Sequence, residues 1–133
     1  MKTLPSLPSD LLELALEDLK KAEKNPNYKI DMGDWHTPDG DACSVCMAGA
    51  VIGFTLDAGF EDMNPYDFPK DIQDKLLAIN ALRKGGVTDA EDWLPALRGK
   101  DIANFKVVHY KVNPEKFKSD IQAMIEGLRK YGV

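Results

Sequence analysis

Asp41-Ala-Cys-Ser-Val-Cys-Met-Ala-Gly-Ala-Val-Ile-Gly-Phe-Thr-Leu56 is the stretch around which the 133-residue chain is organised. Between Ala42 and Leu56, only Ser44 and Thr55 are polar. The run is too short to span a bilayer, which takes about 20 apolar residues. Because a helix that is apolar on every side is a buried one, the stretch predicts a central helix over about residues 42–57.

The predicted helix has a start signal and a face of small side chains. Asp41 is expected at its N-cap, where a carboxylate accepts free backbone N–H groups and suits the positive end of the helix dipole. The small residues that share one helical face are Cys43, Cys46, Ala50 and Gly53, with Gly49 beside them. Glycine inside a helix costs roughly 1 kcal/mol relative to alanine, so two glycines indicate that another backbone packs closely here.

The remaining segments predict a mostly helical α+β fold, a single compact domain over residues 1–133 with about five helices and a minimal two-stranded sheet. Four further helices are predicted. The first starts at Ser9 or Asp10, with capping-box spacing from Asp10 to Glu13, and ends just before Asn25. The others run from Pro69 to about Lys84, over a short segment opened by Thr88 and Glu91, and from Pro114 to about Lys130. The predicted strands are Tyr28–Met32 and Phe105–Val112, and the predicted loops are Gly33–Asp41 and Glu61–Pro69.

Composition indicates an ordinary globular domain, with 44% hydrophobic and 29% charged residues. The first residues, Met1–Pro8, lack the apolar segment of a signal peptide. Two cysteines in a C-x-x-C setting without a secretion signal favour reduced thiols. We therefore expect a cytoplasmic protein with no membrane association.

The net charge of −5 is distributed unevenly along the chain. Residues 31–74 hold ten acidic side chains and one basic one, Lys70. Such a segment disfavours nonspecific nucleic-acid binding, which depends on neutralising phosphates. It favours a basic partner surface or a cation, and the alternative is a solvated rim that keeps the domain soluble.

Metal binding is one alternative. His36, Cys43 and Cys46 lie within eleven residues of one another, and His109 could complete a tetrahedral His2Cys2 set of the kind that zinc prefers. A single C-x-x-C is a weak signal, and buried thiols that act as small apolar side chains are the favoured explanation. A zinc-stabilised structural module is thus kept as an alternative to a protein without metal or cofactor.

Cysteine-dependent catalysis is a second alternative. Cys43 is expected in the first helical turn, where the helix dipole lowers the pKa of a thiol. His109, on a predicted later strand, is the usual kind of partner for Cys43 or Cys46 in a hydrolase. No asparagine or glutamine can be identified as an orienting or oxyanion-stabilising group, so the catalytic set is incomplete.

A ligand-binding or partner-binding site is expected at the loop before the central helix. The loop carries a carboxylate, an aromatic ring and an imidazole in succession, at Asp34, Trp35 and His36. It is expected to lie near Asp41 and the free N–H groups of a helix start. A small anionic, nucleotide-like ligand could bind there. The basic residues Arg83 and Lys84 (with Arg98 and Lys100) could add phosphate contacts. The competing interpretation is that Trp35 covers one end of the core.

Self-association is a further alternative. The face formed by Cys43, Cys46, Ala50 and Gly53 could accept a helix from a second copy and so form a homodimer. More commonly, such a face accepts a helix of its own chain.

Three segments resemble a group of small, uncharacterised proteins of tailed bacteriophages. They are Ile30-Asp-Met-Gly-Asp-Trp-His36 with Cys43-Ser-Val-Cys-Met-Ala-Gly-Ala-Val51, and Ile79-Asn-Ala-Leu-Arg83. The resemblance implies an accessory or host-takeover factor, such as an inhibitor of a host defence protein or a protein that sequesters a nucleotide signal. It carries no catalytic signature. We therefore expect a non-enzymatic binding protein of the host cytosol.

Overall fold

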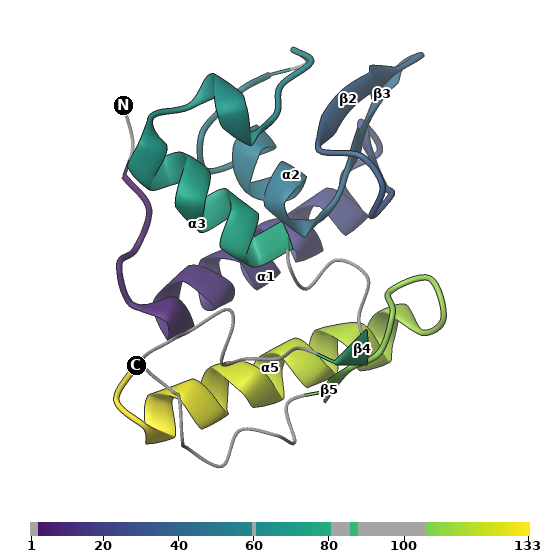
Figure 1. Ribbon diagram of the computed structural model, residues 1–133. Helices are drawn as coiled ribbons and strands as arrows, with labels where there is room; N and C mark the ends of the chain where they lie inside the picture. Colours follow the sequence, from purple (N-terminus) through teal and green to yellow (C-terminus); the bar gives the residue numbers. More distant parts are fainter. Residues whose placement is uncertain (1–2, 60, 81–85, 88–105) are drawn as a thin grey trace.

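The computed structural model describes residues 3–59, 61–80, 86–87 and 106–133 (Figure 1). This part of the chain forms four α-helices, α1 (Pro8–Lys24), α2 (Met47–Gly53), α3 (Lys70–Asn80) and α5 (Pro114–Lys130), and the 3-10 helix η1 (Pro65–Asp67). The strands β1 (Tyr28–Ile30), β2 (His36–Asp39) and β3 (Ala42–Val45) form one sheet, and β4 (Gly86–Val87) pairs with β5 (Lys106–Val107). The mostly helical α+β class is confirmed.

The number of elements differs from the prediction of five helices and two strands. The described residues hold four α-helices and a three-stranded sheet in the order β1-β3-β2. The predicted helix opened by Thr88 and Glu91 lies outside the described residues, as does the end of the predicted helix over residues 69–84. The predicted strand Phe105–Val112 is shorter within the described part, where only Lys106 and Val107 are in strand and residues 110–112 form a turn.

The predicted central helix over residues 42–57 was wrong in its first part. Ala42–Val45 is the middle strand of the sheet, parallel to β1 and antiparallel to β2, and the helix occupies only Met47–Gly53. A short apolar run fits a buried strand as well as a buried helix, and here two neighbouring strands supply its hydrogen bonds. Asp41 is exposed in the turn after Gly40, whose φ is +64°, and it caps no helix.

The loop predicted over Gly33–Asp41 contains the strand β2. His36, Pro38 and Asp39 are weak strand formers, so the sequence gives no local signal for this strand. Pro38 is tolerated because β2 lies at the edge of the sheet, where a missing N–H breaks no ladder.

The two long amphipathic helices agree closely with the prediction. α1 begins at Pro8, a residue preferred at the start of a helix, but no side chain caps it, so the Asp10–Glu13 capping box was wrong. Both of those carboxylates instead bind Arg129 of α5. α5 begins after Asn113, whose side chain accepts a hydrogen bond from the Lys116 N–H.

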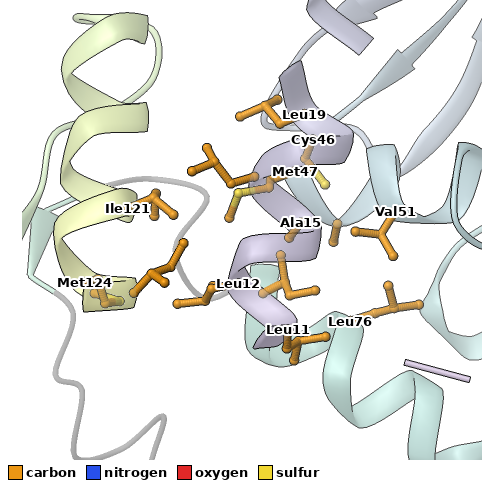
Figure 2. Packing of buried hydrophobic residues seen from close by; sticks show 14 of the residues in the cluster. Leu11, Leu12, Ala15, Leu19, Cys46, Met47, Val51, Leu76, Ile121 and Met124 are labelled. Atoms are coloured by element: carbon orange, nitrogen blue, oxygen red, sulfur yellow. The ribbon is translucent and has the colours of Figure 1, made fainter. Parts of the chain in front are cut away.

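The core is built around α1, which lies between α5 on one side and α2 with α3 on the other (Figure 1). Figure 2 shows Ile121 and Met124 of α5 on one side of α1, and Val51 of α2 and Leu76 of α3 on the other. All seven residues of α2 are buried. The predicted buried helix therefore exists, but α1 occupies the central position expected for it.

Candidate functional site

The backbone of the loop before β2 packs directly on α2. The Asp34 carbonyl oxygen accepts the Cys46 N–H at 2.8 Å. A Cβ placed on Gly49 would lie 1.4 Å from the carbonyl oxygen of Trp35. The close backbone approach predicted for the small-residue face is confirmed, although a loop and not a helix makes it. Trp35 itself is half-buried against the hydrophobic core.

His36 is fully buried and attaches the following loop to the sheet. Its carbonyl oxygen accepts the Met63 N–H at 3.0 Å, and its ring Nδ1 lies 2.6 Å from the Glu61 carbonyl oxygen. Because a carbonyl oxygen can only accept, Nδ1 must carry the proton. Nε2 is buried without a hydrogen-bond partner among the described residues, in a space next to Gly53 and Tyr28.

The Cys43 thiol lacks the environment of an activated nucleophile. It is fully buried on β3, so the first-turn helix position expected from the sequence was wrong. Its Sγ lies 3.8 Å from Nδ1 of His36, whose proton already points to Glu61. Burial raises the pKa of the Cys43 thiol, and the charge of Asp62 raises it further. A reactive thiolate needs the opposite shift.

Cys46, and not Asp41, is the N-cap of α2. Its Sγ accepts the Gly49 N–H at 3.3 Å and its thiol donates to Oδ1 of Asn80 at 3.9 Å. The Cys46 N–H binds the Asp34 carbonyl oxygen. The helix start therefore lies five residues after the expected one at Asp41, and these contacts occupy backbone N–H groups there.

His109 lies in the turn after β5, where its Nδ1 accepts the Lys111 N–H at 3.0 Å. The described residues contain no group of three or more His, Cys, Asp or Glu side chains placed to hold a metal ion. The structure therefore does not gather His36, Cys43, Cys46 and His109 into the predicted zinc set. The histidine beside Cys43 is His36 and not His109.

The predicted ligand residues are not brought together into one site. Asp34 lies at the α2 end of the sheet, whereas Asp41 lies at the opposite end of the β2–β3 hairpin, because His36 pairs with Val45 and Asp39 with Ala42. His36 is buried and Trp35 half-buried. Arg83 and Lys84 lie outside the described residues.

An exposed aromatic residue stands within the acidic segment. Tyr66 is 68% exposed in η1. Asn64 accepts the Tyr66 N–H at 2.8 Å, and Asp67 accepts the Asn64 N–H at 2.9 Å, so a capping box fixes the turn. Pro65 beside Tyr66 is buried and anchors it. We name Tyr66, together with the exposed carboxylates Asp57, Glu61, Asp62, Asp67 and Asp71, the acidic surface.

One charged cluster was missed by sequence reasoning. The Tyr110 hydroxyl donates to Glu23 at 2.6 Å, and the Lys118 ammonium binds Glu23 and Glu115, each at 2.8 Å. Burial, then the hydrogen bond to Glu23, raises the pKa of Tyr110. Burial tends to lower the pKa of Lys118, but the two carboxylates raise it overall. Glu23 and Lys118 are 95 residues apart, so no local pattern predicts their contact.

Comparison with known proteins gave no relative: no family model, curated protein or solved structure matches the chain. Within the described residues, no helix is both long enough and apolar enough to cross a membrane.

Proposed function

We propose that this chain is a non-enzymatic binding protein that inhibits a partner protein by covering a basic surface on it. In line with the resemblance to tailed-bacteriophage proteins, the proposed setting is the cytosol of a bacterial host and the proposed target is a host factor, such as a defence protein. The observation that carries the proposal is Tyr66, an exposed aromatic ring on a fixed turn within the acidic segment, with Asp67 next to it in the same turn.

Tyr66 has the properties of an interface anchor. Tyrosine is enriched among the residues that dominate binding energy, because it offers a large apolar area with few rotatable bonds. Its turn is fixed by the Asn64 capping box, so little backbone entropy is lost on binding. The exposed carboxylates of the same segment favour a partner rich in lysine and arginine, which can also place cations over the ring.

The contacts near the cysteines give less support to the alternatives. A buried Cys43 with a raised pKa is a poor basis for a cysteine-dependent hydrolase. A nucleotide site centred on Trp35 would need N–H groups at the start of α2 that Asp34 and Cys46 already occupy.

The test is a set of parallel capture experiments from host lysate with the full chain and its variants as bait. The wild type should retain a partner that salt releases, and Tyr66→Ala should weaken its measured affinity by at least about 2 kcal/mol, the usual threshold for a hot spot. The double variant Asp62→Asn/Asp71→Asn should slow association and reduce its salt dependence.

Two matched controls remove similar groups elsewhere. Val112→Ala truncates another exposed apolar side chain, and Glu126→Gln removes an exposed carboxylate of α5. Both should bind like the wild type. A partner that binds Tyr66→Ala and the aspartate double variant as tightly as the controls would refute the acidic surface as the binding site.

A further inference from the structure

A recess lies between α1 and α5, at the Glu23–Lys118–Glu115 cluster. It has a volume of about 410 Å³. α1 contributes Leu16, Lys20, Glu23 and Lys24 to its lining. α5 contributes Glu115, Lys118, Ser119 and Gln122. We propose that this α1–α5 recess binds a small phosphate-bearing anion.

The side chains that line the recess carry a net positive charge, whereas the chain as a whole is negatively charged. Three lysines face two glutamates, in a protein whose net charge is −5. The larger groove on the outer face of α1 has the opposite balance, with Asp10, Glu13, Glu17 and Asp18 against Lys21. An anion that approaches the protein is therefore favoured at the α1–α5 recess over that groove.

Lys118 is the fixed element of the recess. Its side chain is only 14% exposed, and its ammonium is held by Glu23 and Glu115 at 2.8 Å each. An ammonium group has three N–H donors, so one donor is left for a ligand after these two contacts. Glu115 is 86% exposed and can turn into solvent, which would release a second donor.

Lys20 and Lys24 supply positive charge that is free to move to a ligand. Lys24 is exposed and forms no ion pair with a described residue. Lys20 pairs with Glu17 at 3.6 Å, a surface contact worth at most about 1 kcal/mol. Both side chains lie one helical turn apart on the face of α1 that lines the recess.

The remaining lining fits a small molecule. Ser119 and Gln122 offer neutral hydrogen-bond donors, and buried Leu16 gives an apolar patch. The volume lies within the range of small-ligand sites, about 300–1,000 Å³. Lysine binds phosphate as a point charge, and the three lysines leave a formal surplus of one positive charge over the two glutamates of the recess, which favours an anion.

The test is a titration of the isotope-labelled full chain with inorganic pyrophosphate, followed by the NMR shifts of backbone amides. Saturable shifts are expected at Lys20, Lys24, Ser119 and Gln122. Lys24→Gln should weaken binding by about two- to fivefold, the range of a partly exposed ion pair, and Glu115→Gln should strengthen it by a similar factor. Lys130→Gln removes an exposed lysine at the far end of α5 and should leave binding unchanged.

Three results would overturn the proposal. The first is a set of NMR shifts that fail to saturate, or that are spread evenly over the surface. The second is equal weakening of pyrophosphate binding by Lys24→Gln and Lys130→Gln. The third is tighter binding of citrate than of pyrophosphate, which would assign the recess to carboxylates. This inference does not depend on the acidic surface, whose variants leave all the lining residues intact. Each proposal can therefore fail without the other.

Discussion

The carbonyl oxygen of Trp35 occupies the space that a side chain at Gly49 would need, with only 1.4 Å between that oxygen and an ideal Cβ. The contact fastens the segment before β2 to the buried helix α2. Together with the hydrogen bond from the Cys46 N–H to the Asp34 carbonyl oxygen, it fixes where β2 begins. The position of His36, and through it the loop that leads to Tyr66, follows from this packing.

Gly49→Ala should therefore destabilise the protein by about 3 kcal/mol, the upper end of the usual cost of overpacking, because the new methyl group meets backbone atoms that cannot rotate away. Chemical denaturation of the variant and the wild type measures the difference. Gly33→Ala is the matched control, since a Cβ there would meet only the flexible Asp31 side chain, at 3.2 Å. A near-native midpoint for Gly49→Ala would contradict the close contact.

Asp18 gives a pH-dependent prediction. It is 1% exposed and accepts a hydrogen bond from the Thr55 hydroxyl at 2.5 Å. Burial raises the pKa of this carboxyl above its ordinary value of 3.8. The folded state therefore holds the proton more tightly than the unfolded state, so stability falls as pH rises through the interval above 3.8.

Asp18→Asn keeps an oxygen that can accept the Thr55 hydroxyl but removes this pH dependence. The free energy of unfolding of the variant, relative to the wild type, should therefore rise with pH over the same interval and then level off. Asp41→Asn, at the exposed hairpin turn, is the control. A relative stability that falls with pH would show that the Asp18 charge is favoured in the fold.

The two cysteines should react slowly in the folded protein. Cys43 is fully buried with a raised pKa, and Cys46 is 2% exposed. A thiol-specific chromogenic reagent at neutral pH should label both only after denaturation, because the thiolate is the reactive species. Rapid labelling of Cys43 in the native state, lost in Cys43→Ser but not in Cys46→Ser, would reinstate the cysteine-dependent hydrolase as an alternative.

Tyr110→Phe should cost about 1.5 kcal/mol at neutral pH, since it leaves the Glu23 carboxylate without a charge-assisted hydrogen bond. The pKa of Tyr110 is raised above its ordinary value of 10.0, so wild-type stability falls as pH rises past that value, while the phenylalanine variant has no such term. The gap between the two proteins should therefore narrow in alkaline solution. A gap that widens would contradict the Tyr110–Glu23 contact.

The parts of the fold that could be predicted from sequence are those set by local periodicity. α1 and α5 carry apolar residues at helical spacing over 17 residues each, so their bounds were predicted within one or two residues. Ala42–Val45 could not be assigned in this way, because four apolar or small residues fit a strand or a helix. Its pairing with β1 and β2 decided the outcome.

The candidate site was predictable only in its composition. The acidic segment was visible as a charge imbalance, and its carboxylates are exposed in the structure except for half-buried Asp34. The full burial of His36 could not be predicted, because the strand β2 that carries it has no local signal in the sequence. Tyr66 stands out only once its exposure is known, and the α1–α5 recess depends on contacts across most of the chain's length.

The backbone hydrogen bond between His36 and Met63 also bears on the tendency of the protein to aggregate at high concentration. β2 is a border strand of the small sheet, and an open border can add a strand from another molecule and seed aggregates. Here Met63 occupies the border at His36, and Pro38 offers no N–H further along. Charged, exposed Asp39 ends the strand. The β2 border is thereby protected against the addition of a strand from another molecule.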